Sequence, residues 1–403
     1  MTQSRRHLAL FLSGLAGGGA QRRMVTLANA FAARGHDVDL VPASSEGAFG
    51  ANLSDPVRLV GLDPWWIRLP GLAALKGPRV LASTPALAAY LRRERPDALL
   101  SSSNPANAAA LLARRLAGTA TPVVVSVNVP VSLATAEGAG RKRTWMGALV
   151  RRLYPSADGL VAISEGVADD LASWAGLPRE RVETIHNPVE AEAIRARARA
   201  PLDHPWFAGD AAPVLLGVGK LKRQKDFATL LRAFARVRKE RAARLLLLGE
   251  GEQRPQLLAL ARELGLEADV QLPGFVENAA AYMARASVFV LSSAWEGFSN
   301  ALVEALACGC PVVSTDCPSG PAEILRQGAL GPLVPVGDDA AMADAILGVL
   351  EAPPDPEPLR LRADDFSVDR ATERYLEVLE AARAKRAAVR ALGGRRAERA
   401  AGT

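Results

Sequence analysis

Aromatic residues are scarce in this 403-residue chain, in which Phe, Trp and Tyr together make up 5% of the sequence. Few side chains are therefore available to stack on unpaired bases, and we expect no nucleic-acid partner. No uninterrupted apolar run approaches the ~18–20 residues of a membrane-spanning helix, so we expect no integral membrane protein. The short apolar stretch after Arg5 and Arg6 runs straight into a glycine-rich turn. We interpret it as a buried strand rather than as a signal peptide.

Cysteine and histidine are also rare, and the four histidines show no metal-ligand spacing. Cys308, Cys310 and Cys317 lie close together in the sequence, and no histidine is near them. An odd number of cysteines without a neighbouring histidine favours neither a disulfide framework nor a zinc site. We expect three small buried residues in a reducing cytosol. Asp37 and Asp39 have the Asp-x-Asp spacing of a metal motif, but their place at the start of a predicted strand favours a strand edge. We therefore expect no metal ion and no bound cofactor.

Acidic and basic residues balance over most of the chain, and the net charge of +6 comes from residues 381–403. Two interpretations of this tail stay open: a solvated, frayed Ala/Arg-rich helix, or a segment attracted to anionic lipid head groups. Residues 141–152 raise a similar question, because cations alternate there with apolar side chains and no acid is present. This segment either lies in a membrane interface, with Trp65 and Trp66 as a second aromatic cluster, or packs on the core with a solvated basic face.

Predicted strands and helices alternate along the chain, which is typical of parallel sheets covered on both faces. In the N-terminal half, apolar patterns predict strands at residues 7–13, 37–41, 98–101, 123–127 and 159–163, and a helix at 21–34. In the C-terminal half they predict strands at 214–218, 244–248, 270–272, 288–291 and 311–315, and helices at 226–238, 254–264 and 299–307. We therefore predict an α/β protein of two Rossmann-like domains, with a ligand cleft at their facing carboxyl strand ends.

Domain boundaries follow from the places where this pattern lapses. Residues 191–212 contain prolines and no strand pattern, and we interpret them as a linker between domains at 1–190 and 213–365. After the proline-rich run at 353–358, residues 366–403 are expected to form a final helix and the basic tail. We predict that this helix packs back toward the N-terminal domain.

The most informative segment joins the strand at 288–291 to the helix at 299–307. Ser299 is a good N-cap, and a helix N-terminus offers unpaired N–H groups and a positive dipole end that suit a diphosphate. Glu304 lies roughly 8 Å along this helix, where its carboxylate can accept hydrogen bonds from two ribose hydroxyls. Glu296, in the loop before the helix, can reach a sugar on the other side of the diphosphate. The alternative is an ordinary helix with an exposed Glu296 and a solvated Glu304.

These residues match a known pattern. Glu296 and Glu304, with seven residues between them that include a Gly-Phe-Ser-Asn run, resemble the signature of glycosyltransferase family 4. Segments at 186–188, 217–226, 272–275 and 309–315 resemble the family as well, so the likeness covers nearly the whole chain and is specific in the C-terminal half. The resemblance implies the GT-B architecture, in which two Rossmann-like domains face each other across a cleft. It also implies a retaining transfer from a nucleotide sugar, with acceptor binding in the N-terminal domain and donor binding in the C-terminal one.

The resemblance further implies a role for each matching residue. Glu304 would bind the ribose, and Glu296 would hold hydroxyls of the donor sugar. Lys220 and Lys225, beside Gly219, would neutralise the leaving diphosphate, where charge accumulates as the glycosidic bond breaks. Further donor contacts are implied for Gly297, Phe298, Ser299 and Asn300 around the diphosphate and sugar, and for Gly274 and Phe275 near the base.

The chain departs from the family pattern at two positions. Lys220 stands where the family usually has an arginine, and a lysine cannot form the two-pronged grip of a guanidinium on phosphate. Asn128 stands where many members have a histidine that faces the reacting sugar, and an amide can hydrogen-bond a sugar but cannot act as a base. Gly18 and Gly19 belong to a loop that faces phosphate and acceptor in the family, although a glycine triplet after a strand is also an ordinary tight turn.

We therefore expect a retaining glycosyltransferase that moves a hexose or an N-acetylhexosamine from a nucleotide-diphosphate sugar, with UDP favoured, to a glycan or a polyprenyl- or other lipid-linked acceptor. A two-step mechanism needs a carboxylate nucleophile, and the sequence offers no convincing one. The resemblance to the family implies front-face displacement instead. The expected location is the cytoplasm, with peripheral attachment to an anionic membrane surface on its inner face. Two alternatives stay open: a sugar-nucleotide 2-epimerase of the same fold, and a non-catalytic nucleotide-sugar binder.

Overall fold

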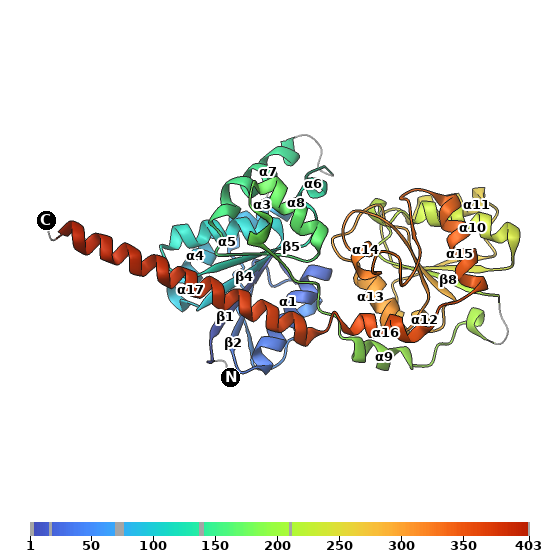
Figure 1. The fold of residues 1–403 in the computed structure, drawn as a ribbon, viewed down its shortest axis with the longest axis horizontal. Helices are drawn as coiled ribbons and strands as arrows, with labels where there is room; N and C mark the ends of the chain where they lie inside the picture. The colour runs from blue at the N-terminus through green and yellow to red at the C-terminus, as the bar shows by residue number, and fades with distance from the viewer. Residues whose placement is uncertain (1–3, 16–17, 69–75, 137–140, 209–211, 402–403) are drawn as a thin grey trace. The chain divides into compact units, whose positions relative to one another are not determined.

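Strands and helices alternate along the chain and build two separate sheets, both with all strands parallel (Figure 1). The computed structural model describes residues 4–15, 18–68, 76–136, 141–208 and 212–401. The chain divides into a first unit of Met1–Pro188 with Val368–Thr403, and a second unit of Val189–Ser367. The predicted α/β class with two Rossmann-like domains is confirmed.

The first unit contains a seven-stranded sheet in the order β3-β2-β1-β4-β5-β6-β7. Its strands are short and almost fully buried, as expected for a parallel sheet covered by helices. The chain winds outward from β1 in one direction and then returns to β4, so the winding direction changes between β1 and β4. The strands are β1 (His7–Leu12), β2 (Asp37–Pro42), β3 (Val57–Leu59), β4 (Ala98–Ser102), β5 (Val123–Val127), β6 (Gly159–Ala162) and β7 (Val182–Thr184).

Helices of the first unit include one that comes from the far end of the sequence. Side chains of α1 and α17 share one buried cluster with one face of the sheet, and Met24, Phe31 and Tyr375 are fully buried in it. The final helix thus belongs to the first unit. The helices of this unit are α1 (Gly19–Ala33), α3 (Lys76–Ala82), α4 (Thr84–Glu94), α5 (Asn104–Ala117), α6 (Val131–Ala136), α7 (Arg141–Leu153), α8 (Glu165–Ala175) and α17 (Val368–Ala401).

The second unit contains a six-stranded sheet in the order β10-β9-β8-β11-β12-β13, with its change of winding direction between β8 and β11. Its strands are β8 (Val214–Val218), β9 (Arg244–Leu248), β10 (Val270–Gly274), β11 (Val288–Leu291), β12 (Val312–Thr315) and β13 (Leu333–Val334). Its helices are α9 (Ala191–Ala198), α10 (Phe227–Glu240), α11 (Arg254–Glu263), α12 (Ala279–Met283), α13 (Asn300–Ala307), α14 (Pro321–Ile324), α15 (Asp339–Glu351) and α16 (Pro356–Asp364). Leucines of β9 and the apolar face of α10 form the centre of its core.

The predicted linker differs from the structure. Residues Ala191, Ile194 and Ala198 are buried on one side of α9, which packs against α12 and α13 in the second unit. The Arg285 guanidinium donates to the backbone oxygens of Ala198 and Ala200 and fixes the end of this helix. The segment is therefore largely part of the second unit, and the apolar spacing of three and four residues was the signal for it.

Helix α17 also extends beyond its predicted end. It continues to Ala401, whereas Ala382 is the last buried residue up to position 391, where the description of its side chains ends. Figure 1 shows its C-terminal part projecting away from the first sheet. The basic tail is thus a continuation of the packed helix α17, and its backbone stays helical to Ala401.

Asp37 and Asp39 lie in β2, in agreement with the expectation that they belong to a strand. Asp39 is buried and is the centre of a network of charged and polar side chains. Its carboxylate accepts two hydrogen bonds of 2.7 Å from Arg58, one of 2.9 Å from His7 and one of 2.5 Å from the Tyr90 hydroxyl. Burial alone would raise the pKa of Asp39, but these hydrogen bonds outweigh it and hold the pKa well below its usual value. This network ties together four elements at the amino ends of the strands.

The basic segment at 141–152 forms most of α7, and the side chains of residues 141–144 lie outside the described part. Val150 is fully buried, and α7 packs against α5, α6 and α8. The Arg151 guanidinium lies 5.7 Å from the centre of the Trp174 ring and donates to the Trp174 backbone oxygen. These contacts favour the core-facing interpretation of this helix.

The three cysteines are free and buried, as the sequence predicts. Burial raises the pKa of Cys308 and of Cys317 to about 12. Burial also raises the pKa of Cys310. None of these thiols is therefore a nucleophile in the folded chain at neutral pH.

Candidate functional site

The loops after β8 and β11 meet at the carboxyl edge of the second sheet. These strands are neighbours, and the chain winds away from them in opposite directions. Such a change of direction separates the following loops and opens a crevice, which is where doubly wound sheets bind ligands. Gly219 and Lys220 follow β8, and Glu296 lies in the loop that follows β11.

Glu296 is buried, with 5% of its surface exposed, and its carboxylate is held by three donors. It accepts a hydrogen bond of 2.5 Å from the Lys225 ammonium, one of 2.7 Å from the Ser293 hydroxyl and one of 3.4 Å from the Gln224 amide. The Lys225 side chain is itself only 15% exposed. A buried carboxylate needs such partners, because an unpaired charge would be strongly penalised by desolvation. The exposed Glu296 of the alternative interpretation is therefore excluded.

Two loops that are far apart in sequence are joined around this ion pair. The Gln224 side-chain amide donates to the Trp295 backbone oxygen over 2.8 Å, and the Ala294 N–H donates to the Gln224 backbone oxygen over 2.8 Å. The Ser292 hydroxyl donates to the Lys225 backbone oxygen over 2.8 Å. Sequence reasoning did not name Gln224 or Ser293 as site residues, although both lie within three residues of ones that it did name.

Glycines let the backbone of this site pack closely. A Cβ on Gly249, which has a φ of +139°, would lie 2.0 Å from the Gly219 backbone oxygen. Gly219 in turn lies against Lys225, whose Cε would be 3.1 Å from an added Cβ. Gly274 accepts a hydrogen bond from the Gly249 N–H over 2.8 Å, which connects the end of β10 to the same group of loops. The Phe275 side chain beside it is 78% exposed.

Helix α13 begins at Asn300, directly after the buried residues Gly297, Phe298 and Ser299. The Phe298 ring packs edge-on against Phe366, with ring centres 5.3 Å apart. Ser299 is at the N-cap position, but its hydroxyl does not cap the helix. The buried Ser299 oxygen has no hydrogen-bond partner within the described residues. The prediction of a capping serine is therefore wrong in this respect, and a buried polar atom is left facing the start of the helix.

Glu304 and Asn300 lie on α13 and are partly exposed, with Glu304 one turn beyond the first residue of the helix. Lys220 is exposed and forms no ion pair within the part of the chain that the structure describes. The structure thus brings Lys225 together with both Gly219 and Glu296. It leaves Lys220 exposed, two residues after the end of β8.

The first unit has a corresponding edge at its own change of winding direction. Gly18 has a φ of +140° and precedes α1, which begins at Gly19, whereas Gly17 lies outside the described residues. Asn128 follows β5, and its side-chain oxygen accepts a hydrogen bond of 2.6 Å from Arg23 of α1. Sequence reasoning missed Arg23, because an arginine on an amphipathic helix ordinarily faces the solvent.

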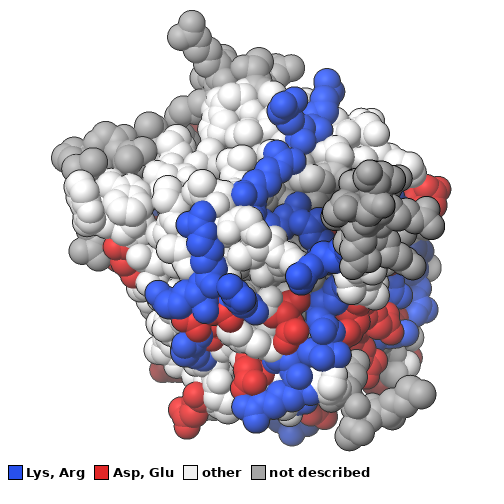
Figure 2. Space-filling model, turned by 90° about the vertical axis from the view of Figure 1, so that its left-hand side faces the viewer, with Lys and Arg blue, Asp and Glu red and all other residues white. Residues whose placement is uncertain are grey.

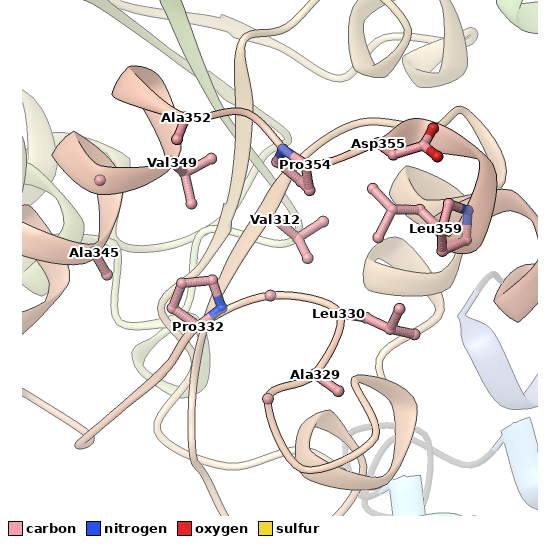
Figure 3. Close-up of a pocket in the computed structure, with 14 residues that line it drawn as sticks. Val312, Ala329, Leu330, Pro332, Ala345, Val349, Ala352, Pro354, Asp355 and Leu359 are labelled. Atoms are coloured by element: carbon pink, nitrogen blue, oxygen red, sulfur yellow. The ribbon is translucent and has the colours of Figure 1, made fainter.

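A separate apolar pocket of about 510 Å³ lies in the second unit at the amino end of β12 (Figure 3). Val312, Leu330, Val349 and Leu359 project into it from β12, the loop before β13, α15 and α16. The Glu296 loop follows the carboxyl end of β11, so the pocket lies at the opposite edge of the sheet. It is not part of the candidate site.

Within the described residues, no group of three His, Cys, Asp or Glu side chains is arranged to hold a metal ion. Nor does any helix in the described ranges combine the length and the apolar character needed to cross a membrane.

Comparison with known proteins matches each half of the chain to a glycosyltransferase sequence model. The sequence model described as "Glycosyltransferase Family 4" matches residues 17–193, and the one described as "Glycosyl transferases group 1" matches residues 212–352. Together the two matches cover most of both units.

Two curated relatives illustrate the similarity. The N-acetylgalactosamine-N,N'-diacetylbacillosaminyl-diphospho-undecaprenol 4-alpha-N-acetylgalactosaminyltransferase of Campylobacter jejuni is 36% identical over 203 residues, which are 50% of this chain and 53% of that protein. The lipopolysaccharide core biosynthesis glycosyltransferase LpsE of Rhizobium meliloti is 32% identical over 235 residues, which are 56% of this chain and 65% of that protein. The matched segments thus span between half and two thirds of these relatives.

Solved structures share the fold over nearly the whole chain. A glycosyltransferase of Rickettsia africae has a TM-score of 0.75 at 15% identity, covering 94% of this chain and 99% of its own. HepE of Anabaena, solved in complex with UDP, has a TM-score of 0.73 at 20% identity, covering 93% and 99%. These likenesses establish the GT-B architecture.

Proposed function

The chain belongs to glycosyltransferase family 4, and from this premise we propose that it is a retaining glycosyltransferase that uses a nucleotide-diphosphate sugar. The donor sugar is a hexose or an N-acetylhexosamine, with UDP as the favoured nucleotide. The observation that carries this proposal is the buried Glu296–Lys225 pair beside the N-terminus of α13, at the change of winding direction of the second sheet. The pair supplies fixed charges of both signs at the place where this fold binds nucleotides.

Each part of the donor has a matching group in the second unit. The positive dipole end of α13 and the buried Ser299 hydroxyl suit the diphosphate, and Glu304 one turn later suits the ribose. Glu296 holds hydroxyls of the sugar, and the two carboxylates thus bind on opposite sides of the diphosphate. Gly274 and Phe275, at the end of β10, are assigned to the base. Gly297, Phe298 and Asn300 shape the backbone between these contacts.

Glu296 positions the sugar rather than attacking it, because Lys225 and Ser293 already occupy its carboxylate. In the proposed step the acceptor oxygen bonds to the anomeric carbon while the bond from that carbon to the diphosphate breaks. The electron pair of the broken bond stays on the diphosphate, which takes the proton of the acceptor hydroxyl. Lys225, and Lys220 at the surface, stabilise the negative charge that develops there. A covalent sugar on Glu296, found by mass spectrometry with trapping donor analogues, would overturn this step.

The acceptor side is assigned to Gly18, Gly19 and Asn128 in the first unit. The Campylobacter jejuni relative is named for an acceptor linked to diphospho-undecaprenol. A lipid-linked glycan is therefore the proposed acceptor class, and a peripheral position at the cytoplasmic face of a membrane is the proposed location of the enzyme. No metal ion is required in this proposal, because the helix N-terminus and the lysines neutralise the diphosphate.

A basic groove of the first unit supports contact with an anionic surface. It lies between the ends of α4 and α5 and the exposed part of α17, and Arg92, Arg95, Arg386 and Arg390 line it. Figure 2 views the molecule from the side on which α17 ends, and basic side chains spread over much of this face, with acidic side chains among them in its lower half. Binding to vesicles that contain phosphatidylglycerol should fall steeply with added salt and weaken in an Arg95→Glu/Arg390→Glu variant. Binding to neutral vesicles of equal strength would contradict the electrostatic account.

Incubation with a panel of UDP-, GDP- and ADP-sugars tests the donor assignment, with nucleotide release as the readout. We expect slow hydrolysis of one donor by the wild type and its loss in Glu304→Ala. A free, epimerised sugar among the products would instead identify a 2-epimerase. Nucleotide binding without any release, even with a membrane lipid extract added, would identify a non-catalytic binder.

A further inference from the structure

A positive charge is buried at the carboxyl edge of the first sheet without a counter-ion. The Arg23 guanidinium, which is 2% exposed, donates hydrogen bonds to Ser102 over 2.8 Å, to Asn128 over 2.6 Å and to Asn187 over 3.3 Å. All three acceptors are neutral oxygens, and Arg23 forms no ion pair among the described residues. The Nε atom of Arg23 is buried and has no hydrogen-bond partner among the described residues. Burying an unpaired charge destabilises a fold, so stability does not explain this arrangement.

The arginine determines which way the Asn128 amide points. A guanidinium has only donors, so the atom of Asn128 that faces it over 2.6 Å must be the amide oxygen. The other terminal atom is therefore the amide nitrogen, which donates to the Ser102 hydroxyl over 3.0 Å. An amide nitrogen carries two hydrogens, and only one is used in this contact. Asn128 is partly exposed, which makes the second hydrogen available at this edge.

Ser103, which follows Ser102 in the sequence, has a second polar group without a hydrogen-bond partner among the described residues. Ser103, between β4 and α5, has a φ of +89°, which is strained for a residue other than glycine. Its buried hydroxyl does not cap α5 and has no partner within the described residues. Strain and an unsatisfied hydroxyl beside the change of winding direction between β1 and β4 are typical of an edge that is built around a ligand.

We propose that Arg23 is a positioning residue that holds Asn128 as a fixed hydrogen-bond donor to an oxygen of the reacting sugars. This inference rests on the proposed transferase function. In such a site, position 128 contributes a donor and no base, which agrees with a mechanism in which the leaving diphosphate accepts the acceptor proton. Arg23 acts through Asn128 and does not touch the substrate, because its own surface is covered.

A double-mutant cycle on activity tests the coupling. Arg23→Gln and Asn128→Ala should each lower kcat/KM for transfer by roughly 3- to 10-fold, the range for a lost hydrogen bond between neutral groups. The double variant should be no worse than Asn128→Ala alone, because Arg23 has nothing left to position. Arg23→Lys keeps the charge but loses the planar guanidinium with its several donors, and it should be more active than Arg23→Gln. Multiplying effects in the double variant would overturn the inference.

Controls separate this inference from the proposed function and from misfolding. Arg22→Gln removes an exposed arginine from the adjacent position of α1 and should leave kcat/KM within about twofold, since surface substitutions cost little. Nucleotide affinity should stay unchanged in all variants, because these residues lie in the first unit. A crystal structure of Arg23→Gln needs no turnover: we expect a rotated or disordered Asn128 amide. An Asn128 side chain that keeps its place there would overturn the inference, whereas an inactive wild type would count against the proposed function alone.

Discussion

Replacing Glu296 by glutamine tests the donor site at its centre. The change keeps the shape of the side chain and removes the charge that faces Lys225 over 2.5 Å. The Lys225 ammonium then loses its only carboxylate partner among the described residues, and the sugar loses a charged acceptor. A hydrogen bond to a charged group contributes about 1.5–3 kcal/mol. If the transition state is weakened by one such hydrogen bond, kcat/KM falls by about 10- to 100-fold.

The assay is transfer or donor hydrolysis, with nucleotide affinity measured in parallel by calorimetry. We expect the fall to appear mainly in kcat, with the dissociation constant of the free nucleotide unchanged, because Glu296 is assigned to the sugar and not to the nucleotide. Glu263→Gln, an exposed carboxylate on α11, is the matched control and should behave as the wild type. A Glu296→Gln variant with kcat/KM within about threefold of the wild type, and with unchanged thermal stability, would refute this reasoning.

Three further predictions concern stability, thiol chemistry and metals. Asp39→Asn should lower the free energy of unfolding by about 3 kcal/mol, since it leaves buried partners unpaired, whereas Asp37→Asn, in an exposed pair, should cost less than about 1 kcal/mol; urea denaturation distinguishes the two. Because the pKa of Asp39 is lowered by folding, its contribution is complete above the unfolded pKa of about 4 and should be lost as the pH falls below it. The buried cysteines should resist iodoacetamide at pH 8 in the folded protein and all react in urea, and labelling of the folded chain would contradict their burial. Finally, EDTA should leave donor hydrolysis unchanged, and recovery only upon added Mg²⁺ or Mn²⁺ would contradict the metal-free proposal.

Much of the fold was predictable because the strands of a parallel sheet are read directly from their apolar runs. All ten strands predicted from the sequence are present, and both sheets are parallel as expected. The strands that were missed, β3, β7 and β13, have two or three residues each and carry no usable pattern. Helix α9 was missed for a different reason, because its eight residues were judged by the neighbouring prolines rather than by their own spacing.

The candidate site was predictable where the sequence keeps its residues together. Gly297 through Glu304 are contiguous, so their place in the loop before α13 and in the first turns of that helix followed from the loop and helix pattern. Lys225 and Glu296 are 71 residues apart, and only the resemblance to a family suggested a shared site for them. The contact between them depends on how two loops pack, which local pattern does not encode.

The first unit shows the limit of sequence reasoning more sharply. Asn128 was recognised as a departure from a family pattern, but its orientation depends on Arg23, which is 105 residues away. The residue type alone did not indicate a buried position, because a buried arginine without a carboxylate partner is rare. The signals that identify it are burial and an unpaired Nε, and both require coordinates.

The central claim, that this chain transfers a sugar from a nucleotide donor with retention, is tested most directly by product analysis. The protein is incubated with the donor that it hydrolyses and with a lipid-linked glycan acceptor, and the product is examined by mass spectrometry and by NMR of the new anomeric proton. We predict an acceptor heavier by one hexose or N-acetylhexosamine, with the anomeric configuration of the donor, formed by the wild type and not by Glu304→Ala. An inverted linkage, or a donor that is consumed without any sugar reaching an acceptor, would contradict the account.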